Sequence, residues 1–165
     1  MKKIVAHAVG LALLSAAGYV SAQTCAAPVA LNGHAQPVSG NTCNGTNIIG
    51  TYCGVSSSAQ KDDIYSVTLA TPTATSIALS NQGGATYTPA LILFSGTCVN
   101  GDNCAANFIA SAAGGSGSLS LSGVSDGSYF LAVTSDPNAG SSDCGAYNLT
   151  WTGTLPVKVQ SFSVD

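Results

Sequence analysis

The clearest catalytic pattern in the chain is Gly123-Val124-Ser125-Asp126-Gly127, which matches the Gly-x-Ser-x-Gly nucleophile motif of hydrolases. In those enzymes a strand-to-helix turn exposes the serine above a sheet. Here the segment joins two predicted strands, so Asp126-Gly127 is typical of a hairpin turn. The base would have to be His34, which lies in a polar stretch that predicts an exposed loop. We therefore expect a turn at Ser125 and no enzymatic activity.

Aspartates are the only acidic side chains in the sequence, and most of them occupy turn-like positions where they accept backbone hydrogen bonds. Asp62 and Asp63 are adjacent, so on a strand they point to opposite faces and do not form the facing pair of a glycosidase. Carboxylate oxygens at strand ends can bind calcium, although the chain has no Asp-x-Asp-x-Asp run. We expect no cofactor. Calcium is the alternative, with Asp62, Asp63, Asp102 and Asp143 as candidate ligands.

Six cysteines predict three disulfides, because an even number in an exported chain usually forms such a framework. Zinc is disfavoured because the sequence has no Cys-x-x-Cys pair. Cys43 and Cys53 flank one polar loop, and Cys98 and Cys104 flank another, so sequence proximity suggests these two pairs. Elimination then joins Cys25 to Cys144.

Aromatic side chains fall into two groups. One group is in phase with the apolar positions of predicted strands and is assigned to the core: Tyr65, Tyr129, Tyr147 and Trp151. The other group is out of phase and supplies candidates for stacking on a ligand such as a sugar ring or collagen: Tyr52, Tyr87 and Phe130.

The first 22 residues have the pattern of a signal peptide. Lys2 and Lys3 precede a mostly apolar stretch at 4–20, and Val20-Ser21-Ala22 provides a small-x-small cleavage site. The apolar stretch is interrupted by polar residues and glycines, so a retained membrane anchor is disfavoured. We expect a secreted, extracellular protein, with the periplasm or the cell surface as alternatives.

The charge of the chain excludes several classes of partner. The full chain has a formal charge of −3, and loss of Lys2 and Lys3 with the signal peptide lowers it to −5. Nucleic acids require clustered Lys and Arg for phosphate contacts, so we expect no nucleic-acid partner. For the same reason we expect no association with anionic membranes after cleavage.

The remaining sequence alternates between apolar and polar residues in short runs separated by turn residues, a pattern typical of an all-β sandwich or barrel. Strands are expected near 65–69, 77–79, 90–94, 108–110, 119–121, 129–133, 147–151 and 157–164. The run 90–94 is apolar on both faces, as in a central strand. The expected organisation is a signal peptide at 1–22, a disulfide-anchored N-terminal segment at 23–60, a sandwich core at 61–153 and an edge strand or tail at 154–165.

Four strand motifs occur in the order found in one known family. They are KDDIYSV at 61–67, LILF at 91–94 followed by Cys98, GSYFLAV at 127–133 and GAYNLT at 145–150. Together they cover residues 62–151, and in this respect the chain resembles the bacterial pre-peptidase C-terminal (PPC) domain family.

The resemblance implies a jelly-roll-like antiparallel β-sandwich without catalytic activity. Members of the family are attached to secreted proteins, often behind a peptidase, and are related to collagen- and polysaccharide-binding modules. No peptidase precedes these motifs in the sequence, so we expect a free-standing member.

These observations lead to a functional hypothesis and its rivals. We expect a secreted accessory or binding module that adheres to an extracellular protein or polysaccharide. The alternative is a self-associating structural or surface subunit, a homo-oligomer in which the tail at 157–164 adds a strand to a neighbour's sheet. A small hydrolase or a protease inhibitor is the third alternative.

Overall fold

The fold is an all-β sandwich of two sheets, which confirms the predicted fold class. The computed structural model describes residues 24–56, 59–71, 74–98 and 103–156. The predicted signal peptide and the predicted strand at 157–164 lie outside these ranges. Within them, no helix is both long enough and apolar enough to cross a membrane.

The larger sheet has five strands in the order β1-β5-β10-β7-β8. Their bounds are β1 Val29–Ala30, β5 Asp63–Leu69, β10 Gly127–Ser135, β7 Pro89–Ser95 and β8 Asn103–Ile109. All pairs in it are antiparallel except β1 with β5.

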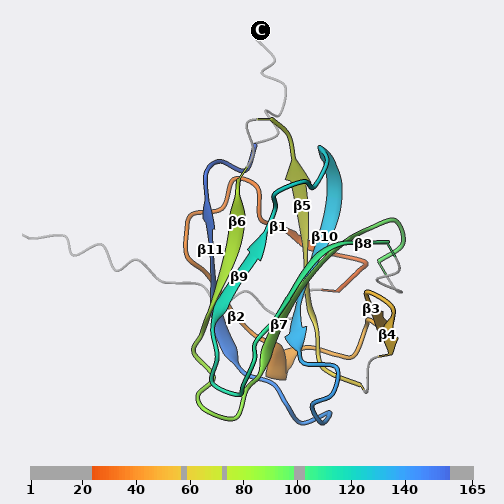
Figure 1. Cartoon of the computed structure of the whole chain (residues 1–165), viewed down its shortest axis with the longest axis vertical. Coiled ribbons are helices and arrows are strands. Elements are labelled where there is room, and N and C mark those ends of the chain that lie inside the picture. Colours follow the sequence, from red (N-terminus) through yellow and green to blue (C-terminus); the bar gives the residue numbers. More distant parts are fainter. Residues whose placement is uncertain (1–23, 57–58, 72–73, 99–102, 157–165) are drawn as a thin grey trace, which may run out of the picture.

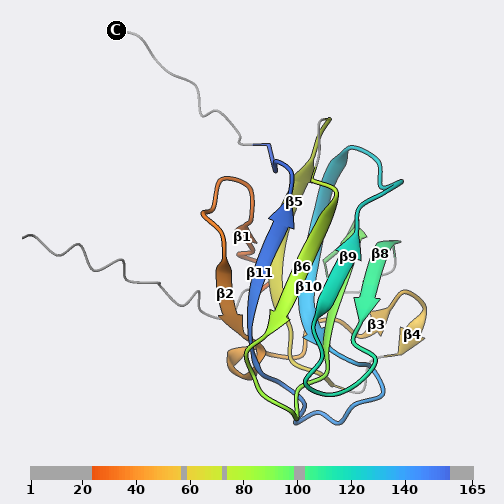
Figure 2. The ribbon, with the colours of Figure 1, turned by 60° about the vertical axis from the view of Figure 1, so that its left-hand side comes forward.

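The smaller sheet has four strands in the order β2-β11-β6-β9, with β2 Val38–Asn41, β11 Ala146–Thr152, β6 Ser76–Asn81 and β9 Gly117–Ser120. A separate hairpin pairs β3 Thr51–Tyr52 with β4 Val55–Ser56, and a short 3-10 helix, η1, spans Thr42–Asn44. Figure 1 shows the two sheets and the β3–β4 hairpin at the lower right, and Figure 2 turns the four-stranded sheet toward the viewer.

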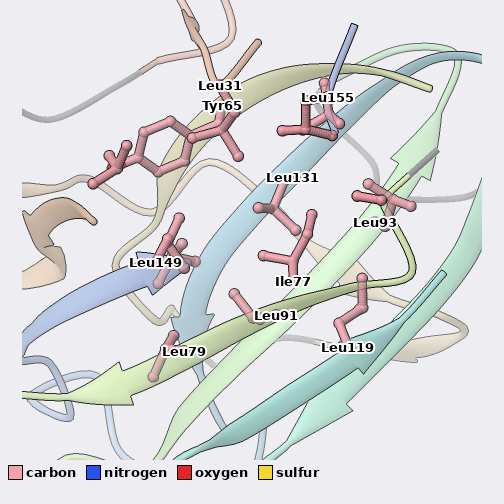
Figure 3. Packing of buried hydrophobic residues seen from close by; sticks show 14 of the residues in the cluster. Leu31, Tyr65, Ile77, Leu79, Leu91, Leu93, Leu119, Leu131, Leu149 and Leu155 are labelled. Atoms are coloured by element: carbon pink, nitrogen blue, oxygen red, sulfur yellow. The ribbon is translucent and has the colours of Figure 1, made fainter. Parts of the chain in front are cut away.

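The main core lies between the two sheets and follows from the alternation of the strands. On β5, Tyr65, Val67 and Leu69 are buried and face β11 and β6. Figure 3 shows leucines and Ile77 from both sheets meeting Tyr65 in this layer. The strands at 65–69, 77–79, 90–94, 119–121, 129–133 and 147–151 were therefore placed correctly by their period-two pattern, although β8 begins at Asn103, earlier than expected.

The five-stranded sheet is apolar on its outer face as well, which explains why every residue of β7 from Pro89 to Phe94 is buried. A second buried cluster covers this face and contains Ile49, Ile64, Ile92, Phe94, Cys98 and Ala132. Its cover comes from the chain between β2 and β5, which we call the covering segment (residues 42–62). The outer face of the four-stranded sheet carries no such layer in Figure 2.

The disulfides connect the covering segment and the N-terminus to strands far away in the sequence. The pairs are Cys25–Cys98, Cys43–Cys144 and Cys53–Cys104, with sequence separations of 73, 101 and 51 residues. The three disulfides were predicted correctly, but all three predicted pairings are wrong. Each predicted local pair would close its own loop, whereas the sheet order places the covering segment against the ends of β7, β8 and β11.

A buried chain of hydrogen bonds links the two sheets. The Tyr65 and Tyr147 hydroxyls lie 2.8 Å apart, and the Tyr147 hydroxyl donates to Asp63 Oδ2 at 2.8 Å. The Tyr147 ring lies against Gly40 on the neighbouring strand β2, where a Cβ atom would overlap it. Burial raises the pKa of Tyr65 to about 12, and the Asp63 carboxylate adds to this rise against the opposing effect of the Tyr147 hydrogen bond. Burial, Tyr65 and Asp63 also raise the pKa of Tyr147 well above its ordinary value.

The first prediction concerns the longest disulfide loop. Replacing Cys43 and Cys144 together with serine should lower the free energy of unfolding by about 2–5 kcal/mol, because the unfolded chain gains the entropy of a loop of roughly 100 residues. Urea unfolding of the mature protein measures this loss. Non-reducing peptide mapping should recover the three pairs above, and a Cys43–Cys53 linkage would contradict the structure.

The second prediction concerns stability at high pH. Because both tyrosines hold their protons more tightly in the folded state, their contribution is complete below pH 10, the ordinary tyrosine pKa, and is lost as pH rises through about 12. By pH 12, Tyr65 alone should lower the free energy of unfolding by roughly 2 kcal/mol, and Tyr65→Phe should flatten this slope. Denaturant melts from pH 8 to 12 test this. Equal slopes for wild type and variant would contradict it.

Candidate functional site

The best-formed candidate site is a hollow on the outer face of the five-stranded sheet, over β5 and β10. Its volume is about 310 Å³, and its lining consists of Ser66, Val67, Thr68, Gly96, Ser128, Tyr129 and Phe130. We call this the β5–β10 hollow. It lies beside the part of the sheet that the covering segment protects, so it marks where that cover ends.

The register of β5 and β10 places the polar groups of the hollow in two adjacent cross-strand pairs. Thr68 pairs with Ser128, and Ser66 pairs with Phe130. Each of these side chains alternates with a core residue, so all four point to the outer face. Three hydroxyl groups and one aromatic ring are thereby held on rigid strands.

The Phe130 ring has a fixed support. Its cross-strand neighbour on β7 is Phe94, and the two ring centroids lie 5.7 Å apart with an angle of 30° between the ring planes. Phe94 is fully buried, whereas Phe130 is only partly buried and packs against the edge of the second cluster. One part of the Phe130 ring is therefore fixed by the core while another remains accessible at the hollow.

The hollow also has a clear electrostatic character. None of its lining residues is ionisable at neutral pH, apart from the phenol of Tyr129, and that hydroxyl donates to the Ser125 carbonyl oxygen at 2.8 Å. An apolar ring beside a few hydrogen-bonding groups is the usual composition of a ligand site, and this volume is at the small end of the usual range. The arrangement suits a neutral ligand with both an apolar face and hydroxyl groups.

A second hollow of about 350 Å³ lies over β2 and β11, lined by Ser39, Gly40, Gln82, Ala146, Tyr147 and Asn148. Tyr147, its one aromatic residue, is only 1% exposed, and its hydroxyl is used in the buried chain of hydrogen bonds. This hollow therefore offers no ring for stacking, and the β5–β10 hollow is the better candidate.

The three predicted stacking residues have different outcomes. Phe130 lies at the β5–β10 hollow. Tyr87 is wrong as a stacking residue, because it is fully buried, its ring lies against Gly145 and its hydroxyl donates to the Thr134 carbonyl at 2.9 Å. Tyr52 lies on β3, and its side chain is outside the part of the chain that the structure describes.

The candidate calcium ligands are engaged in holding loops together. Asp62 Oδ2 accepts hydrogen bonds from the backbone N–H groups of Ile48 and Ile49 at 2.7 and 2.9 Å. Asp63 accepts from Tyr147, and Asp143 accepts from the Thr88 N–H. Asp102 lies outside the described residues. Within the described ranges, no three His, Cys, Asp or Glu side chains gather as a metal site would require.

The segment around Ser125 lies between β9 and β10, as the sequence predicted for a turn. The Asp126 carboxylate accepts hydrogen bonds from the Thr71 backbone N–H and hydroxyl, which ties this turn to the end of β5. His34 is exposed in the connection between β1 and β2. The strand-to-helix turn of a nucleophile elbow is therefore not formed at Ser125.

Sequence reasoning missed the serines and threonine of the hollow. The signal that could have found them is the alternation itself, since Ser66 and Thr68 occupy the outward positions of β5. Their pairing with Phe130 and Ser128, more than 50 residues later, depends on a non-local strand order that the pattern does not contain.

Comparison with protein-family models, with curated proteins and with solved structures yields no significant match to this chain. The three disulfides are typical of proteins that fold in an oxidising environment outside the cytosol.

The third prediction concerns calcium. Since the carboxylates of Asp62, Asp63 and Asp143 already accept hydrogen bonds from the protein, 5 mM calcium should shift the melting temperature of the mature protein by less than about 1 °C relative to EGTA. Differential scanning calorimetry measures this shift. A larger rise that Asp143→Asn abolishes would reveal a calcium site.

Proposed function

We propose that this protein is a secreted, non-catalytic binding module that adheres to an extracellular polymer through the β5–β10 hollow. The observation that supports the proposal most strongly is the half-buried Phe130 ring, held by Phe94 and adjacent to the hydroxyls of Ser66 and Ser128. A rigid ring binds with little loss of conformational entropy.

Between the two polymer classes, the lining favours a polysaccharide over a protein. A sugar ring has an apolar face, which matches the Phe130 ring, and hydroxyl groups, which match the three side-chain hydroxyls of the hollow. The lack of a charged side chain in the lining favours a neutral polymer. Similarity of the four strand motifs to the PPC family is consistent with this proposal, since that family is related to polysaccharide- and collagen-binding modules.

The proposal also accounts for the disulfides. A binding face built at the border of the covering segment requires that segment to stay in place outside the cell. Cys53–Cys104 and Cys25–Cys98 both lie in or beside the cluster that supports Phe130. Covalent links at these points keep the border of the hollow fixed.

The fourth prediction tests the ring. Phe130→Leu keeps an apolar side chain over the second cluster but removes the aromatic face. We expect it to weaken adsorption to the retaining polysaccharide by about tenfold or more, as loss of an aromatic anchor does at other interfaces. The measurement is a depletion isotherm of the oxidised mature protein on insoluble chitin, cellulose, peptidoglycan and fibrillar collagen.

A matched pair of serine variants provides the control. Ser128 and Ser118 are both exposed serines that follow a glycine at the second position of a strand, but Ser118 lies on β9 in the other sheet. Ser128→Asp should weaken adsorption, while Ser118→Asp should leave it unchanged. Retention on collagen alone would favour a protein ligand, and full retention of Phe130→Leu on every matrix would contradict the proposal.

A further inference from the structure

The sandwich has four edge strands, and they differ greatly in how well they are protected. An unprotected edge exposes backbone N–H and C=O groups that can pair with another strand. Three of the edges are short: β1 has two residues, and β2 and β9 have four each. The fourth, β8, has seven residues and contains neither a charged residue nor a proline.

The outward side of β8 can be assigned from its pairing. β8 pairs only with β7, and the Ala110 N–H donates to the Pro89 carbonyl of the same pair of strands. Because backbone groups alternate sides along an antiparallel strand, the N–H and C=O groups of Asn107 and Ile109 point away from β7. Figure 2 shows β8 at the rim of the molecule, next to β9.

The side chains of β8 fit a neutral partner. Residues at alternate positions are exposed, and Ile109 is the one large hydrophobic residue of the described ranges that is classed as exposed, at 39%. A β-bulge lies where Leu93 pairs with Ala106 and Phe94 with Cys104, so the regular part of the strand is 106–109. The described charged residues lie elsewhere, at 61–63, 126, 136 and 143.

We propose that β8 is a homophilic pairing edge, on which β8 of a second copy adds antiparallel across a two-fold axis. With the axis at Phe108, Asn107 of one copy pairs with Ile109 of the other, and the same pair repeats on the opposite side of the axis. Both residues have outward-pointing backbone groups, so the register uses only groups that β7 leaves available. The two Phe108 residues then meet at the non-hydrogen-bonded position, where side chains are closest.

Charge favours a second copy as the occupant. The mature chain has a formal charge of −5, so contacts between copies through acidic regions are repulsive. β8 has no charge, and the two-fold register needs no complementary charge on the partner. The result is a continuous ten-stranded sheet made from two five-stranded sheets, and it does not depend on the polysaccharide site on β5 and β10.

The fifth prediction tests this edge by sedimentation velocity of the mature protein. The contact is at the small end of specific interfaces, so we expect dimer to appear as concentration rises from about 10 μM to about 1 mM. Asn107→Pro removes one outward N–H without affecting the β7 ladder and should abolish the dimer. The matched control Ser118→Pro lies on β9, the edge of the other sheet, at an exposed position.

Two further readouts make the test decisive. A chain ending at Pro156 should still form the dimer, whereas loss of the dimer on this truncation would show that the tail at 157–165 is the pairing strand instead. Hydrogen exchange at Asn107 and Ile109 should slow at high concentration in the wild type, even if a proline variant folds poorly. A wild type that stays monomeric, or exchange at these amides that does not depend on concentration, would overturn the proposal.

Discussion

The constraint on which the structure depends is that the five-stranded sheet is apolar on both faces. Its inner face packs against the four-stranded sheet, but the outer face of β7 and β10 needs a separate cover. The covering segment provides it with Ile48 and Ile49, which Asp62 holds through their backbone N–H groups. Since this cover has little regular structure, disulfides hold it in place. Where the cover ends, the sheet presents Phe130 and the hydroxyls beside it.

Local patterns predicted the strands well and their partners poorly. Alternation placed Tyr65, Val67 and Leu69 in the core and Phe130 on the outer face, because period two is a property of each strand alone. The cysteine pairs failed because proximity in sequence is a poor guide where the strand order is β1-β5-β10-β7-β8. Tyr87 failed for a related reason: it precedes β7 in a turn, where no alternation indicates whether a side chain is buried.

The distribution of charge separates the structural from the functional parts of the molecule. Asp62 and Asp63 are buried and accept hydrogen bonds that fix a loop and link the sheets, so these carboxylates stabilise the fold. The hollow on β5 and β10 and the edge β8 carry no charge. Surfaces of this kind associate through ring packing, hydroxyl groups and backbone pairing, which depend weakly on salt.

The central claim, that the border of the covered sheet face is a ligand-binding surface, is tested most directly by residue-resolved NMR. Labelled mature protein would be titrated with soluble cello- and chito-oligosaccharides, with a collagen peptide as the comparison. The account predicts that shifts concentrate at Phe130, Ser66, Thr68 and Ser128 with the oligosaccharide of the retaining matrix. Shifts confined to the outer face of β2, β11, β6 and β9, or no shifts with any of these ligands, would contradict it.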